Sequence, residues 1–93
     1  MKKFFYRVQS SDSIISVSKK FNVPTYLLIS ENNLKCEISA GDILFISPCE
    51  RTYHVQPLDT LEDIADKLLI SKEKLCFLNG GITHVFYGLV LGY

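Results

Sequence analysis

The chain has 93 residues, of which 47% are hydrophobic, 12% aromatic and 22% charged. This length falls within the size range of one domain and argues against a large enzyme core with a separate cofactor domain, while the apolar content argues against disorder. Ten basic residues balance ten acidic ones, so no net positive charge favours nucleic acid or an anionic membrane surface as a partner.

The N-terminus carries two lysines followed by the apolar stretch 4–8. This stretch is too short for the core of a signal peptide or for a membrane span. We therefore expect no signal peptide, synthesis in the cytoplasm and no membrane span.

The three cysteines, Cys36, Cys49 and Cys76, have no C-x-x-C spacing and cannot all pair with one another. The pattern favours free, mostly packed thiols in a reducing compartment over a zinc site or a disulfide framework. A single Cys36–Cys49 bridge is the alternative.

The chain repeats itself after 47 residues, because segment 6–46 aligns with segment 53–93 without a gap. Nine aligned pairs are identical, whereas ordinary composition gives about two or three. The identical pairs are Tyr6/Tyr53, Val8/Val55, Gln9/Gln56, Asp12/Asp59, Lys20/Lys67, Leu28/Leu75, Asn32/Asn79, Gly41/Gly88 and Leu44/Leu91. We assign residues 4–48 to a first unit, 49–52 to a linker and 53–93 to a second unit.

The first unit opens with alternating residues at 6–9, which predict a strand with Tyr6 and Val8 on one face. The apolar spacing then becomes helical, and Ser13 is placed to cap a helix that ends near Asn22. A second short helix follows Pro24, and the glycine at 41 turns the chain into a last strand at 42–46.

The second unit repeats this order, with a strand at 53–56 and a helix from Thr60 to near Leu69. Asp63 stands three residues after Thr60, which predicts a capping box. A short helix entered at Ser71 stops at 79–81, and a strand follows at 89–93.

The predicted fold is thus α+β, with two tandem β-α-α-β units. Each is expected to have a two-stranded antiparallel sheet and two helices packed on one face. Apolar residues outside the expected cores are candidates for a contact between the units; they are Ile15, Leu27, Ile29, Leu34 and Phe86.

The repeat resembles the LysM family, in which a tyrosine and a valine two residues on precede glycine-aspartate-threonine-leucine, an isoleucine-alanine pair, a late asparagine and a glycine before the last strand. The second unit matches at Tyr53, Val55, Asp59, Thr60, Leu61, Ile64, Ala65, Leu75, Asn79, Gly88 and Leu91. The first unit matches at Tyr6, Val8, Asp12, Ser13, Ile14, Val17, Phe21, Val23, Pro24, Leu28, Asn32, Gly41, Leu44 and Pro48. Two features depart from the pattern: Ser11 and Leu58 replace the glycine before the aspartate, and the second unit has no closing proline.

The resemblance implies a non-catalytic carbohydrate-binding protein that holds N-acetylglucosamine-containing glycan, such as bacterial peptidoglycan or a chitin-type polymer. It implies a shallow groove in each unit, between the loop after the first strand and the loop after the second helix. In the first unit these residues are Ser11, Asp12, Ser13 and Ile14 facing Ile29, Ser30, Asn32 and Asn33. In the second they are Leu58, Asp59, Thr60 and Leu61 facing Cys76, Phe77, Asn79 and Gly80. Two weak sites on one polymer gain on the order of a hundredfold in affinity when both engage.

Local structural roles compete with sugar binding at several of these positions. The two aspartates also suit the turn and helix start, and the two asparagines also suit the end of the second helix. Ile14 and Leu61 suit a core, and Phe77 suits either a sugar face or packing.

We expect no enzyme, cofactor or metal site, because His54 and His84 have no spacing that suggests a nucleophile or a metal partner. The rival function is a LysM-derived interaction or assembly module, for example in a spore or cell envelope, that has lost sugar binding. Such a module binds a protein partner or associates with itself.

Overall fold

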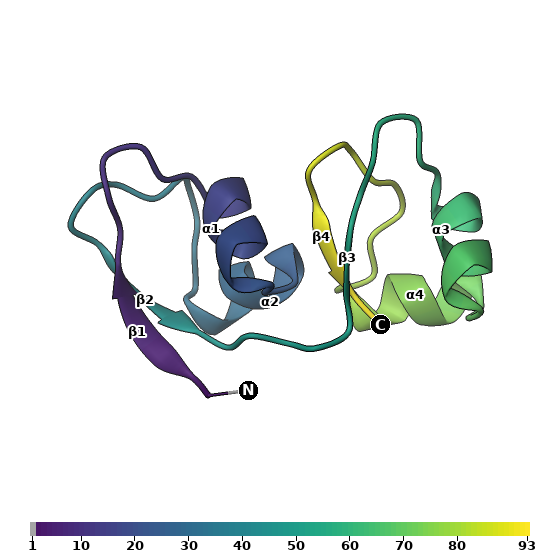
Figure 1. The fold of residues 1–93 in the computed structure, drawn as a ribbon, viewed down its shortest axis with the longest axis horizontal. Helices are drawn as coiled ribbons and strands as arrows, with labels where there is room; N and C mark the ends of the chain where they lie inside the picture. Colours follow the sequence, from purple (N-terminus) through teal and green to yellow (C-terminus); the bar gives the residue numbers. More distant parts are fainter. Residues whose placement is uncertain (1) are drawn as a thin grey trace.

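The computed structural model describes residues 2–93 and confirms two β-α-α-β units, each with a two-stranded antiparallel sheet and two helices (Figure 1). In the first unit the elements are β1 (Phe4–Arg7), α1 (Ile14–Phe21), α2 (Thr25–Glu31) and β2 (Ile43–Ile46). In the second they are β3 (Thr52–His54), α3 (Leu61–Leu68), α4 (Lys72–Leu78) and β4 (Val90–Gly92).

The two sheets have the same strand register, because residues that the repeat aligns lie opposite equivalent partners. Tyr6 lies opposite Leu44 in the first sheet, and Tyr53 lies opposite Leu91 in the second. Because these four positions are identical between the two copies, the sequence repeat is also a repeat of the strand pairing.

The first helix of each unit begins at its predicted cap, where Ser13 and Thr60 accept bonds from the amides of Ser16 and Asp63. The capping box predicted at Thr60 and Asp63 is wrong, since only this one of its two bonds forms within residues 2–93. A complete box occurs instead in the first unit, because the Ser16 hydroxyl accepts from the Ser13 amide at 2.8 Å. A serine hydroxyl can therefore replace the expected carboxylate.

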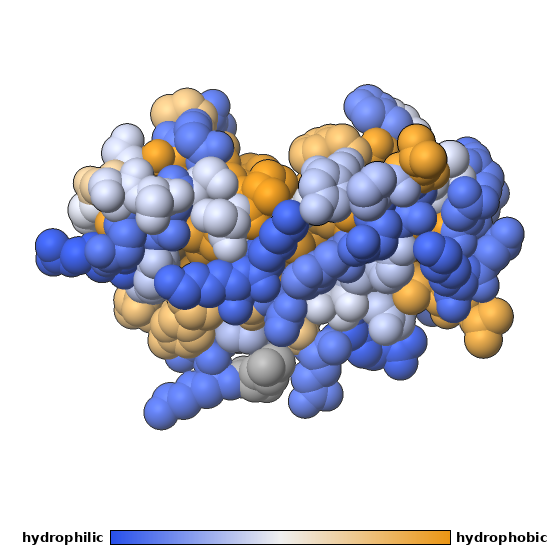
Figure 2. All heavy atoms as spheres, turned by 45° about the horizontal axis from the view of Figure 1, so that its top comes forward, coloured by the Kyte–Doolittle hydropathy of each residue, from blue (hydrophilic) through white to orange (hydrophobic). Residues whose placement is uncertain are grey.

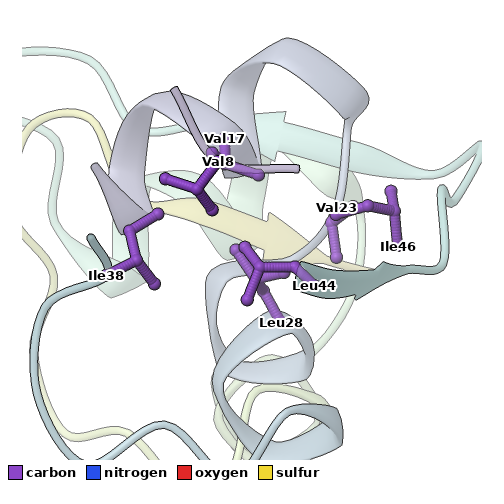
Figure 3. Close-up of a cluster of buried hydrophobic side chains, with 7 residues drawn as sticks. All are labelled: Val8, Val17, Val23, Leu28, Ile38, Leu44 and Ile46. Carbon is purple, nitrogen blue, oxygen red and sulfur yellow. The ribbon is translucent and has the colours of Figure 1, made fainter. Parts of the chain in front are cut away.

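Each unit has its own small hydrophobic core between the sheet and the two helices. The first consists of Val8, Val17, Val23, Leu28, Ile38, Leu44 and Ile46 (Figure 3). The second consists of Val55, Leu61, Ile64, Ala65, Leu75, Leu89 and Leu91. Burial of these side chains provides the main drive to fold two units whose described residues form neither a disulfide nor a cluster of metal ligands.

One asparagine joins the end of the second helix to the last strand of each unit. The Asn79 amide nitrogen donates to the carbonyls of Leu75 at 2.8 Å and Gly92 at 3.0 Å, and its oxygen accepts from the Gly92 amide at 2.8 Å. Asn32 makes the same three bonds, to the Leu28 carbonyl and to both backbone groups of Phe45. The side chain thus pairs with the free edge of the strand as a neighbouring strand would.

We predict that Asn79→Ala lowers the free energy of unfolding by about 3 kcal/mol, because it leaves the backbone groups of Gly92 without partners in a buried place. Urea denaturation followed by circular dichroism measures this change. Lys74→Ala, on the exposed side of the same helix, is the control and should stay within about 0.5 kcal/mol of wild type. An equal effect of both changes contradicts the role of the asparagine.

The two units pack side by side, with α1 and α2 of the first unit against β4 of the second (Figure 1). The Thr25 hydroxyl accepts from the Val90 amide at 3.0 Å, on the edge of β4 that does not face β3. Val90 is fully buried, whereas its counterpart Ile43 is 54% exposed. The first unit therefore covers the outer edge of β4, whereas the equivalent edge of its own strand β2 is open at Ile43.

The interface also depends on glycines of the second unit. A Cβ on Gly80 would lie 2.4 Å from Cδ1 of Tyr26, and one on Gly92 would lie 2.9 Å from Cγ of Pro24. The Cys49 amide, in the connection between the units, donates to the Asn22 carbonyl at 2.9 Å. These contacts leave the two units little freedom to move relative to one another.

Two of the apolar residues predicted for this contact take part in it. Ile15 packs against the core of the second unit, and Ile29 lines the space between the units. Leu27 and Leu34 pack on the core of the first unit instead, and Phe86 is 56% exposed. The helical spacing alone does not distinguish a residue that faces its own core from one that faces the neighbouring unit.

Candidate functional site

The turn after the first strand of each unit is held by the predicted aspartate. The Asp12 carboxylate accepts from the Tyr6 hydroxyl and from the Gln9 amide at 2.9 Å. Asp59 makes the same two bonds with Tyr53 and Gln56, and Lys67 forms an ion pair with it at 3.2 Å. Both aspartates therefore have the local structural role that was the alternative to sugar binding, since they hold the turn after the first strand.

These bonds lower the pKa of both carboxyl groups. For Asp12 the main cause is the Tyr6 hydroxyl, followed by the Gln9 amide. For Asp59 the main cause is the Tyr53 hydroxyl, followed by the Gln56 amide. Because the folded pKa lies below the unfolded value of about 3.9, each aspartate stabilises the fold above about pH 4. This contribution is lost as the pH falls through the folded pKa.

We predict that the melting temperature of the wild type falls more steeply between pH 5 and 2 than that of the double variant Asp12→Asn/Asp59→Asn. The variant keeps the shape of both turns but has no carboxylate to titrate. Thermal melts followed by circular dichroism measure the two profiles, and Asp66→Asn on exposed α3 surface should retain the wild-type slope. Parallel profiles for the wild type and the double variant contradict a role for these carboxylates.

Leu58 precedes Asp59 in the position where the LysM pattern has glycine. Its φ is +69°, in the left-handed region, and its side chain is 97% exposed. A residue with a Cβ pays roughly 1–2 kcal/mol in this conformation, and the exposed side chain gains little by burial in return. Among the described residues, its counterpart Ser11 has no positive φ, so the two turns differ in backbone conformation.

We predict that Leu58→Gly raises the free energy of unfolding by about 0.5–1 kcal/mol, since the relief of strain exceeds the entropy that glycine adds to the unfolded chain. Ser11→Gly is the matched change and should lower it by about as much, because that backbone is unstrained. Urea denaturation of both variants gives the comparison. Destabilisation by both glycines contradicts the assignment of strain to Leu58.

A small cavity lies between the turn after β3 and the loop between α4 and β4. Its volume is about 190 Å³. One wall consists of Asp59, Thr60, Leu61 and Glu62, and the other of Thr83, His84 and Val85. The structure thus brings together three of the predicted residues of the second unit, Asp59, Thr60 and Leu61, with four that the sequence did not predict.

The cavity offers both polar and apolar groups to a ligand. Leu61 is the first residue of α3, where the amide has no carbonyl of the helix to bond, and no acceptor within residues 2–93 takes its place. The Thr83 hydroxyl lies 3.2 Å from Nδ1 of the exposed His84. The ion pair of Glu62 with Lys72, at 2.6 Å, lowers the pKa of Glu62 and keeps a carboxylate at the rim.

Four residues predicted for the second wall line a different space. Ile29, Ser30, Asn79 and Gly80 belong to an apolar cavity of about 330 Å³ between α2 and β4. Figure 2 shows hydrophobic atoms gathered in the hollow between the two units. These residues therefore face the neighbouring unit and not the aspartate turn of their own unit.

The remaining predicted second-wall residues are scattered. Asn32 bonds to β2, and Asn33 is exposed with a φ of +50°. Cys76 packs against the second core as a half-buried free thiol, and Phe77 is 81% exposed. Of the other two thiols, both also free, Cys36 is exposed and Cys49 half-buried.

Sequence reasoning missed the segment 83–85 because this loop has neither helical nor alternating periodicity. A signal was nevertheless present, since Val85 and Ile38 are equivalent apolar residues in the two copies. An apolar pair retained in a loop indicates that the loop returns to the core at that point.

The equivalent space in the first unit is bridged by a side chain. Oε1 of Glu37 accepts from the Ile14 amide at 2.7 Å and from the Ile38 amide at 3.1 Å. These two amides belong to opposite walls, namely the start of α1 and the loop between α2 and β2. Ser13 is the cap of α1, Ile14 packs on the first core and Ser11 is exposed.

Comparison with known families matches the LysM domain model to residues 6–47 and 53–85, which is most of the chain. The chain belongs to the LysM family. LysM domains typically bind peptidoglycan or chitin, and the two matched segments are LysM modules.

Among solved structures, the LysM pair is similar to two spore cortex-lytic enzymes named SleL. The Bacillus cereus enzyme is 21% identical with a TM-score of 0.49, over 99% of this chain and 22% of that one. The Bacillus megaterium QM B1551 enzyme is 24% identical with a TM-score of 0.47, over 96% of this chain and 22% of that one. The chain therefore spans about a fifth of the length of these enzymes. No match was found among curated proteins.

Within the described part of the LysM pair, no helix has the length and apolar character needed to cross a bilayer. No three histidine, cysteine, aspartate or glutamate side chains of residues 2–93 come together in a way that suits a metal ion.

Proposed function

We propose that the chain is a non-catalytic carbohydrate-binding protein that holds N-acetylglucosamine-containing glycan, of the peptidoglycan or chitin type. The observation that supports this most is the cavity between Thr60–Leu61 and Thr83–Val85, which lies at the start of a helix, where the Leu61 amide has no acceptor among residues 2–93. Family membership supports the same ligand class.

The cavity matches the chemistry of an N-acetyl group. An acetamide has one carbonyl acceptor, one N–H donor and one methyl group. The Leu61 amide provides a donor for the carbonyl, the Thr83 hydroxyl or the Glu62 carboxylate provides an acceptor, and Val85 provides apolar contact for the methyl. The volume of about 190 Å³ has room for an N-acetyl group but not for a polymer, so most of the glycan stays outside the cavity.

We predict that the protein is retained on insoluble peptidoglycan or chitin and is eluted by soluble N-acetylglucosamine oligomers. Thr83→Phe should weaken retention at least tenfold, because the ring fills a space that is small and lined on both sides. A pull-down with quantified bound and free protein measures this change.

Lys74→Phe adds the same ring on exposed α4 surface and is the matched control, expected to bind as the wild type does. Melting curves of both variants verify that they fold. Equal retention of the two variants contradicts the assignment of this cavity, and lack of wild-type retention on either polymer contradicts the proposed function itself.

The second candidate is a LysM-derived interaction or assembly module that has lost sugar binding. It is favoured by large exposed apolar side chains outside the cavity, of which Leu58, Phe77 and Tyr87 are 97%, 81% and 64% exposed. Exposed apolar surface is typical of sites that contact proteins. This becomes the leading function if the wild type binds neither polymer.

A further inference from the structure

The candidate grooves of the two LysM units differ at several positions, and at one of them the first unit has a side chain that bonds to both walls. The 47-residue repeat aligns Glu37 with His84, while Ile14 and Ile38 align with Leu61 and Val85. The two amides that lie on opposite walls thus occupy equivalent positions in the two units. The side chain that projects from the second wall is a carboxylate in one and an imidazole in the other.

In the first unit, Glu37 occupies the groove. Its Oε1 lies 2.7 Å from the Ile14 amide nitrogen and 3.1 Å from that of Ile38, so a single oxygen joins both walls. A carboxylate at the start of a helix is also favoured by the helix dipole, and its bonds to amides are stronger than those of a neutral acceptor. An acetamide carbonyl needs the same donor and brings no charge.

In the second unit, nothing in the described chain replaces Glu37. His84 is exposed, and its ring lies near the Thr83 hydroxyl of its own loop. Neither the Leu61 amide nor the Val85 amide has an acceptor among residues 2–93, and the cavity between them is open. The two amide donors of the first unit are therefore bonded to Glu37, whereas the equivalent two donors of the second unit have no acceptor among residues 2–93.

We propose that the chain has one competent glycan groove, in the second unit, and that the Glu37 carboxylate closes the groove of the first. The inference rests on the proposed function and specifies which copy performs it. Residue 37 and its counterpart 84 decide whether a groove accepts an uncharged acetamide. The first unit then acts chiefly as a support for the second, against whose β4 it packs.

The test exchanges the two residues. The probe is N,N′,N″-triacetylchitotriose, titrated into the full ¹⁵N-labelled chain while amide shifts are recorded, with calorimetry for the number of sites. In the wild type we expect shifts at Leu61 and Val85 and one site per chain. Glu37→His should add shifts at Ile14 and Ile38 and a second, weaker site, because Cys36 and Ile15 stand where the second unit has Thr83 and Glu62.

The reciprocal change His84→Glu should weaken binding at the second unit about ten- to a hundredfold, because the ligand then has to displace charge-assisted bonds. Both residues are exposed, so neither exchange disturbs a core, and melting curves verify this. Equal shifts in both grooves of the wild type overturn the inference and leave the proposed function standing. Absence of shifts in the wild type and in both variants overturns the two together.

Discussion

The side-chain amide of one asparagine completes each unit of this protein. A sheet of two short strands is marginal by itself, because one edge of each strand is left with unpaired backbone groups. Asn32 and Asn79 reach that edge from the end of the second helix and bond both to the strand and to the helix. The same three bonds in both copies join the sheet to the helical layer, and the core closes between them. This geometry leaves the asparagines no free group for a ligand.

Two loops form the candidate groove of each unit. One loop is shaped by the tyrosine, the aspartate and, in the second unit, the lysine, which hold the turn after the first strand rigidly at the start of a helix. The other loop connects the second helix of each unit to its last strand. In the two LysM units of this chain it brings Glu37 to one groove and His84 to the other. The two copies therefore present side chains of different charge and reach at equivalent positions of this loop.

The sequence allowed the elements and their order to be predicted, because the change from alternating to helical spacing and the caps at Ser13 and Thr60 are local signals. It also indicated the first wall of the candidate groove through the aspartate turn. The second wall was placed on the end of α4, whereas the structure puts the loop 83–85 there, since an irregular loop carries no periodic signal. The packing of the units was equally hidden. Ile43 and Val90 are both apolar and equivalent, yet only the structure shows that the first is open and the second covered.

The bond from the Val90 amide to Thr25 has a consequence for anyone who divides the chain. Unpaired edge strands are templates for intermolecular sheet growth, and proteins usually protect them. Here the protection of β4 comes partly from the preceding unit. If the chain is cut around residues 49–52, the outer edge of β2 in the first half does not change. The second half exposes the outer edge of β4, a strand without polar side chains. The second unit expressed alone should therefore be prone to self-association through β4, and any test of glycan binding should use the intact pair.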